Sequence, residues 1–149
     1  FVEFAIAGFA EERGQEEATR ADYSSSANDN LIVDGIEGAD TSIGWVGYAY
    51  YKSEGDRLKA IAVAGDDGAC VMPTDETVAD GSYPFSRDLF IYVNSAKLAS
   101  NPALGPFVDH YLNEAYNESV TKAFGETGYV ALPAAELTKS KDAWKTARG

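Results

Sequence analysis

Few residues in this sequence have the types and the spacing that catalysis requires. His110 is the only histidine among the 149 residues, and it stands between Asp109 and Tyr111 beside an apolar helical stripe. A serine hydrolase of the common kind holds its nucleophile on a Gly-x-Ser-x-Gly turn, which the sequence lacks. We therefore interpret His110 as a residue on a helix surface and predict no catalytic residue.

Cys70 is the only cysteine, which excludes an internal disulfide and a cluster of thiolate metal ligands. A reactive thiol needs a basic neighbour or a helix N-terminus, whereas the residues close to Cys70 include Asp66 and Asp67. We interpret Cys70 as a small buried apolar residue. The alternative is a disulfide with a cysteine outside this chain.

Two short polar runs have the composition of a calcium site without its spacing. They are residues 28–30, Asn-Asp-Asn, and residues 66–68, Asp-Asp-Gly. A calcium loop alternates its oxygen ligands along the chain and ends in a bidentate Glu, and neither run does so. We therefore predict no metal site and no cofactor.

The first of these runs is better suited to starting a helix. The turn at residues 24–30 contains several good N-cap residues, and the helix that follows should end near Gly38. A helix N-terminus carries unpaired N–H groups and a partial positive charge of about half a unit, which attracts anions. Asn28, Asp29 and Asn30 would stand at this end, although every helix has one and most face only water.

The composition excludes several classes of protein. With 12 basic and 24 acidic residues the net charge is -12, so the chain lacks the basic surface of a general nucleic-acid binder. The sequence has no cluster of Lys and Arg that would bind the surface of an anionic membrane. It also has no apolar run that approaches the roughly 20 residues needed to cross a bilayer. Hydrophobic residues make up 45% of the chain, which suits one ordinary domain.

Apolar spacing along the chain indicates helices that alternate with short strands, which is typical of an α/β fold. Helices are expected over residues 1–9, 31–38, 102–112, 120–124 and 137–144, and strands over residues 42–47, 58–63 and 88–93. The strand at 88–93 is the most apolar, and we expect it to be buried on both faces. A loop is expected from Glu11, and Tyr83 should be extended because proline follows it.

Several motifs occur in an order that resembles one family. They are Arg20-Ala21-Asp22-Tyr23, Ile43-Gly44-Trp45-Val46-Gly47-Tyr48-Ala49-Tyr50-Tyr51, Leu58-Lys59-Ala60-Ile61-Ala62-Val63, and Gly81-Ser82-Tyr83-Pro84-Phe85-Ser86-Arg87 followed by Leu89-Phe90-Ile91-Tyr92-Val93. From about residue 20 to about residue 133 the chain resembles the C-terminal half of the periplasmic phosphate-binding proteins that serve phosphate ABC transporters. The resemblance implies part of a two-lobed α/β fold, similar to the type II periplasmic binding proteins, that closes over phosphate.

The resemblance also implies a division of the chain between the lobes. Residues 1–84 would be part of the second lobe, and residues 85–149 would form the crossing and a contribution to the first lobe. Tyr83 and Pro84 would serve as the hinge, because closure needs a few backbone positions that absorb rotation. We interpret Arg87 as structural, with an anion clamp as the alternative, and Arg20 as a surface residue that pairs with Asp22.

The main phosphate contacts of the family cannot be placed in this sequence. The family holds phosphate with a loop of the first lobe, an acidic residue, and an Arg followed by a Ser-Gly-Thr turn. Phe1 begins an apolar helix that matches the helix after that turn, so we expect the primary contacts upstream of Phe1. Asn28, Asp29 and Asn30 are weaker candidates for a supporting contact.

These observations lead to the expectation of a solute-binding protein fragment rather than an enzyme. It would be periplasmic or on the cell surface, with a lipid anchor in the full-length protein as one option. One expected partner is phosphate, which this chain would bind jointly with the N-terminal half. A second is a membrane ABC permease. The faces that pack between the lobes could also mediate self-association. The alternatives are a phosphoester-processing enzyme that uses His110 or an acidic cluster, and an interaction module without ligand.

Overall fold

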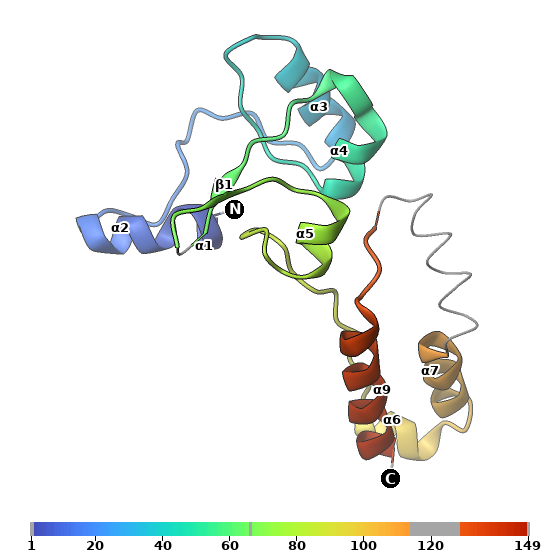
Figure 1. Ribbon diagram of the computed structural model, residues 1–149. Coiled ribbons are helices and arrows are strands. Elements are labelled where there is room, and N and C mark those ends of the chain that lie inside the picture. The colour runs from blue at the N-terminus through green and yellow to red at the C-terminus, as the bar shows by residue number, and fades with distance from the viewer. Residues whose placement is uncertain (1, 66, 114–128, 149) are drawn as a thin grey trace. The chain divides into compact units, whose positions relative to one another are not determined.

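The computed structural model describes residues 2–65, 67–113 and 129–148, and the chain forms two compact units (Figure 1). Unit 1 comprises Phe1–Pro73 and Tyr83–Phe85, and unit 2 comprises Thr74–Ser82 and Ser86–Gly149. The helix expected over residues 120–124 lies outside the described residues. The described residues form helices, one short ladder of strands and several irregular stretches, so the fold is mixed and rich in helix.

Unit 1 begins with two helical segments, α1 (Val2–Ala5) and α2 (Ala7–Arg13). Ile6 joins them, because its N–H donates to the carbonyl of Val2 at 2.9 Å and its own carbonyl accepts from Ala10 at 2.8 Å. The prediction of a loop from Glu11 was wrong, since the helix continues to Arg13. The acidic and basic side chains of that stretch are good helix formers that face solvent. Gly14, at φ 61, ends the helix in the left-handed conformation.

Helix α3 (Asp29–Glu37) confirms the prediction of a helix after the polar turn. Asn28 is its N-cap, with the side-chain oxygen accepting from the N–H of Asn30 at 3.1 Å. Val33 points inward from the middle of the helix and is completely buried. A Cβ at position 44 would lie 2.8 Å from Cδ1 of Ile36, so the absence of a side chain at Gly44 lets the next loop pack directly on α3.

The strand predicted at residues 42–47 is absent, because this stretch is irregular and leads into α4 (Tyr48–Glu54). Contact with α3 takes the place of pairing with another strand here. On α4, Tyr48 and Tyr51 are three residues apart, and their ring centroids are 6.0 Å apart. The two tyrosines therefore pack against each other along the helix. A short 3-10 turn, η1 (Gly55–Arg57), follows directly.

The described residues contain one ladder, formed by β1 (Val63–Ala64) and β2 (Cys70–Val71). The strands are antiparallel, with Val63 opposite Val71 and Ala64 opposite Cys70. The predicted strand at residues 58–63 thus shrinks to its last residue and the one after it. Cys70 is exposed, so the prediction that it is buried was wrong. Because each strand has only two residues, the ladder leaves Ala64 and Cys70 exposed to solvent.

Unit 2 consists of α5 (Asp75–Ala79), α6 (Ser95–Ser100), α7 (Leu104–Leu112) and α9 (Ala134–Arg148), within the described residues. Helices α7 and α9 pack side by side in this unit (Figure 1). The prediction of a C-terminal helix is confirmed, and α9 extends beyond residues 137–144 at both ends. Helix α7 starts two residues later than predicted, because Asn101 accepts from the N–H of Ala103 at 3.0 Å in a turn.

The segment at residues 88–93 corrects the clearest strand prediction. It is irregular, and its large apolar side chains are exposed rather than buried on both faces. No neighbouring strand in the described part of the chain is present to pair with it. Just before it, Tyr83 lies in a bend and Pro84 in a turn, so the expected extended dipeptide is not formed.

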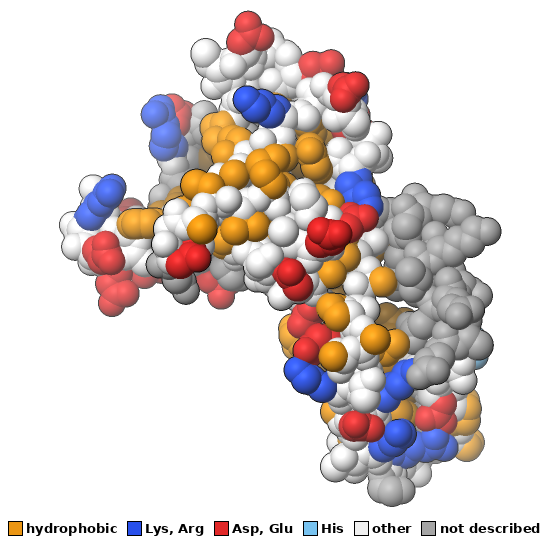
Figure 2. Space-filling view, viewed as in Figure 1, with side chains coloured by type: hydrophobic (Ala, Val, Ile, Leu, Met, Phe, Trp, Pro, Cys, Tyr) orange, Lys and Arg blue, Asp and Glu red, His pale blue; other side chains and the backbone are white. Residues whose placement is uncertain are grey.

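Little apolar surface is fully covered by the described residues. The buried hydrophobic side chains are Ala10 and Val33 in unit 1 and Val108 in unit 2. Figure 2 shows hydrophobic side chains gathered at the surface of unit 1. In the described ranges, no helix combines the length and the apolar character that crossing a bilayer would take.

Candidate ligand-binding site

The three residues proposed from sequence lie at the N-terminus of α3. The N–H of Asn28 donates to Oγ of Ser26 at 3.0 Å, and Oδ1 of Asn28 accepts from the N–H of Asn30 at 3.1 Å. Asn28 and Asn30 are exposed, whereas Asp29 is partly buried in the first turn. The structure therefore brings the three residues together, but they stand at a solvated helix end.

This helix end has mixed electrostatics. The N–H groups of the first turn favour a negative charge, as at any helix N-terminus. The carboxylate of Asp29 already occupies that favourable position and would repel a second anion. Asn28 and Asn30 are therefore better suited than Asp29 to contact an anionic ligand.

A cluster around Arg57 connects α3 to the end of α4, and sequence reasoning did not find it. Nη2 of Arg57 donates to Oδ1 of Asp34 at 2.9 Å and to Oε2 of Glu37 at 2.6 Å. Its Nη1 donates to Oε2 of Glu54 at 2.5 Å. Asp34 and Glu37 lie three residues apart on one face of α3, and this spacing is the sequence signal that was available.

The Arg57 cluster balances charge at two helix ends. Carboxylates near helix C-termini are unfavourable, and the guanidinium compensates for three of them. Hydrogen bonds to Glu37, Asp34 and Glu54 raise the pKa of Arg57, so the side chain stays charged at any ordinary pH. Because Arg57, Asp34 and Glu37 are exposed, water screens these ion pairs and limits what they add to stability.

Arg20 and Arg87, which the sequence also singled out, differ in whether they form an ion pair. Arg20 pairs with Asp22, with Nε–Oδ1 and Nη2–Oδ2 distances of 2.8 and 2.5 Å, which confirms the predicted surface salt bridge. The bond from Arg20 lowers the pKa of the Asp22 carboxyl. Arg87 is exposed and makes no ion pair with any residue that the structure describes.

The predicted hinge residues follow a tight turn. Hydrogen bonds from Ser82 lower the pKa of the Asp80 carboxyl, and Gly81 between them takes φ 78. Tyr83 is half-buried, and its burial raises the pKa of its phenol. Its ring packs edge-on against Phe85, with the centroids 6.0 Å apart. The residues predicted as the hinge thus lie next to a glycine turn, and Tyr83 belongs to a packed aromatic pair.

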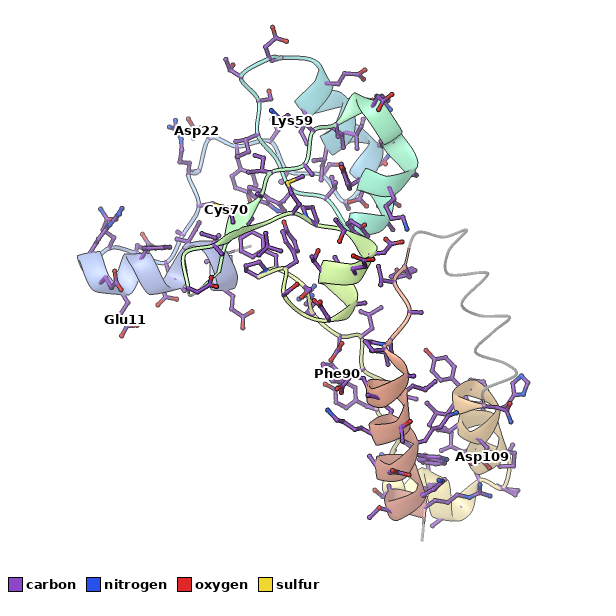
Figure 3. All side chains as sticks on the ribbon, viewed as in Figure 1. Glu11, Asp22, Lys59, Cys70, Phe90 and Asp109 are labelled. Atoms are coloured by element: carbon purple, nitrogen blue, oxygen red, sulfur yellow. The ribbon has the colours of Figure 1, made fainter. Side chains whose placement is uncertain are left out.

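His110 lies on α7 and is exposed, which confirms its assignment to a helix surface. Its neighbour Asp109 contacts α9 instead, accepting from Nε1 of Trp144 at 2.8 Å and pairing with Arg148. The hydrogen bond from Trp144, together with Arg148, lowers the pKa of the Asp109 carboxyl. The polar groups of this region therefore hold two helices together (Figure 3).

Among the residues described, no three His, Cys, Asp or Glu side chains lie close enough together to hold a metal ion. One shallow hollow of about 360 Å³ borders the N-terminal helices, lined by residues such as Phe9, Arg13 and Gln15. It contains none of the residues singled out from sequence. The end of α3 thus remains the candidate for a ligand contact.

Comparison with known proteins identifies relatives along most of the chain. It is 44% identical over 121 residues to Protein SphX of Synechocystis sp. and 36% identical over 129 residues to Protein SphX of Synechococcus elongatus. It is 35% identical over 116 residues to the phosphate-binding protein PstS of Staphylococcus saprophyticus. These alignments cover 80%, 86% and 78% of this chain. This chain is PstS-like.

The resemblance inferred from the motifs is therefore confirmed at the level of the family. The PstS-like chain spans about a third of the length of these relatives, between 34% and 36%. No family model matches the sequence, and no solved structure matches it significantly. Its PstS-like character thus rests on the curated relatives, which imply a periplasmic binding protein fold.

Proposed function

We propose that this chain is part of an extracytoplasmic solute-binding protein that captures inorganic phosphate for a membrane ABC permease. The observation that carries the proposal is the identity of 35–44% to SphX and PstS proteins over about 80% of the chain. The Staphylococcus relative is named for phosphate binding. The protein would act in the periplasm or at the cell surface, with a lipid anchor in its full-length form as one arrangement.

The architecture that we propose is a two-lobed fold similar to the type II periplasmic binding proteins. Residues 1–84 would be part of the second lobe, and residues 85–149 would form the crossing and a contribution to the first lobe. Tyr83 and Pro84 would be the hinge. The turn at Asp80–Ser82 and the half-buried ring of Tyr83 support a defined pivot at this place.

The primary phosphate contacts would come from the part of a PstS-like protein that this chain does not match. This is consistent with the exposed, solvated character of the α3 N-terminus. Asn28 and Asn30 would supply supporting contacts, and Asp29 would be the least favourable of the three. The net charge of -12 does not oppose this role, because local N–H groups in a cleft are screened less by water than surface charges are.

The sequence also left two alternative hypotheses, a phosphoester-processing enzyme and an interaction module without ligand. No observation favours either of them. His110 lies on a helix surface, and neighbouring Asp109 is engaged with Trp144 and Arg148.

Calorimetry with inorganic phosphate tests the proposal. The chain alone should give no binding heat at micromolar concentrations. The chain combined with the unmatched part of Synechocystis SphX should bind phosphate with a dissociation constant on the order of 1 μM. Sulfate serves as the control for the identity of the oxyanion. Micromolar binding by the chain alone would contradict the proposed location of the contacts.

A further inference from the structure

Helices α7 and α9 are joined at two pairs of positions that face each other. Gly105 and Asp109 are four residues apart on α7, and Trp144 and Arg148 are four residues apart on α9. Residues at this spacing share one face of a helix. Nε1 of Trp144 donates to Oδ1 of Asp109 at 2.8 Å, and Nη1 of Arg148 donates to the other carboxylate oxygen. The carboxylate of Asp109, which Figure 3 labels, therefore binds two residues of the neighbouring helix.

Gly105 provides a seat for the guanidinium of Arg148. A Cβ at position 105 would lie 3.6 Å from Nε, 3.7 Å from Cζ and 3.7 Å from Nη2 of that side chain. Because these three atoms belong to one plane and are almost equally distant, the guanidinium lies flat over α7 at this position. Gly105 is buried, whereas the side chain of Arg148 is 47% exposed. One face of the guanidinium thus covers the backbone of α7, and much of the side chain still contacts water.

The two helices contribute unequally to the surface that they share. Val108 lies on the same face of α7 as Gly105 and is 3% exposed. In α9, where the structure describes every residue, no side chain is buried, and Trp144 is only partly covered. Burial of apolar side chains therefore gives α9 little attachment of its own. Segments with few buried contacts open locally at a lower free energy than the fold as a whole.

We propose that α9 is a strap that opens from α7 and closes on it in one piece, with Arg148, Gly105 and Asp109 as its clasp. Closing covers the face of α7 that carries Val108, and opening exposes that face. The inference concerns unit 2 and does not depend on the proposed function. The alternative is that α9 separates from α7 only when the whole chain unfolds.

The clasp makes the strap sensitive to ionic strength. Its ion pair joins the side chains of Arg148 and Asp109, which are 47% and 40% exposed, so dissolved salt screens their attraction. The ion pair of Lys139 with Glu136 lies within α9 itself and does not attach this helix to α7. Salt should therefore release α9 by weakening the bond between Arg148 and Asp109.

Amide hydrogen exchange on the 149-residue chain tests the inference. At low salt the amides of α9 should be protected, and raising the salt concentration from about 10 mM to about 500 mM should lower their protection at least about threefold. The amides of α3 in unit 1 should change less than about twofold. Three results would each overturn the inference. They are exchange of α9 as in an unfolded peptide, protection of α9 that does not depend on salt, and equal changes in α9 and α3.

Variants of Arg148 separate the clasp from general effects of charge. Arg148→Lys keeps the positive charge but lacks the flat group that lies on Gly105, so it should lower the protection of α9 about tenfold. Lys139→Ala is the matched control, because it removes the pair with Glu136 within α9 and leaves the clasp intact. Its protection should stay within about twofold of the wild type. Equal effects of the two variants would contradict the clasp.

Variants of Gly105 test the seat itself. In Gly105→Ala the methyl group would be in ordinary contact with the guanidinium, at 3.6 Å, so Arg148 should stay in place. In Gly105→Leu the larger side chain would occupy the seat and displace Arg148, and the protection of α9 should fall about tenfold. Equal protection in the two variants would rule out the seat. If Gly105→Leu does not fold, Arg148→Lys decides the question.

Discussion

Asn28 combines two roles that substitution can separate. It caps α3 through its side-chain oxygen, and it is one of the candidates for contact with an anion. Aspartate is as good an N-cap as asparagine, but it brings a negative charge. The two roles therefore predict different responses to replacement by Ala and by Asp.

Asn28→Ala should lower the free energy of unfolding by about 1 kcal/mol, because the N–H of Asn30 loses its acceptor. Asn28→Asp should leave stability nearly unchanged and weaken phosphate binding by about tenfold in the chain combined with the SphX part. Urea denaturation measures the first effect and calorimetry the second. Wild-type affinity in Asn28→Asp would remove Asn28 from the list of ligand contacts.

Asp109 links stability to pH through α7 and α9. The hydrogen bond from Trp144, assisted by Arg148, holds the pKa of its carboxyl below the usual value. A carboxyl with a lowered folded-state pKa stabilises the fold above its unfolded pKa of about 3.9, and this contribution is lost as the pH falls through the folded value.

Asp109→Asn should therefore destabilise the chain most near neutral pH, since Asn still accepts from Trp144 but no longer pairs with Arg148. The difference in unfolding free energy between Asp109→Asn and wild type should shrink below about pH 4. Denaturation curves from pH 7 to pH 2 measure it. A difference that is constant with pH would show that charge plays no part.

At the scale of elements, α3 is positioned by one buried side chain and by the Arg57 cluster. Val33 is fully buried in unit 1, and the loop at Gly44 packs against Ile32 and Ile36 of the same helix. Apolar contact outweighs the ion pairs here, because water screens the exposed pairs of Arg57 with Asp34 and Glu37.

Val33→Ala should cost about 2 kcal/mol of unfolding free energy, since it removes two buried methyl groups and leaves a cavity. Leu31→Ala is the matched control on the same helix, because Leu31 is exposed and should cost less than about 0.5 kcal/mol. Thermal and urea unfolding of both variants provide the comparison. Equal costs would show that α3 packs differently from the structure.

At the scale of the whole molecule, exposed apolar side chains and net charge act in opposite directions. The described residues leave many large hydrophobic side chains exposed, among them Ile43, Leu89 and Phe107. Such surfaces favour association, whereas a net charge of -12 keeps copies apart.

We expect the chain alone to self-associate weakly, and more strongly as salt screens the repulsion between copies. Sedimentation velocity at low and at physiological ionic strength, over a range of protein concentrations, measures this effect. The SphX part should suppress self-association by covering the apolar surface. A monomer under all these conditions would show that the exposed side chains do not drive association.

The helices were predictable to the extent that local interactions determine them. Asn28 and the residues after it predicted α3, and the apolar spacing before Trp144 predicted α9. The motif order also predicted the family, which the curated relatives confirm. Caps and helical periodicity depend on residues within a few positions of each other, so the sequence determined these features without further information.

Strands and burial depended on partners that are distant in the chain. Residues 42–47 form no strand, and Gly44 among them packs on α3. The side chains of Leu89–Tyr92 stay exposed, and Cys70 lies at the surface of a short ladder. The Arg57 cluster joins residues up to 23 positions apart, which no local pattern specifies. Only the tertiary structure decided these points, because a strand or an ion pair is stable only where its partner is within reach.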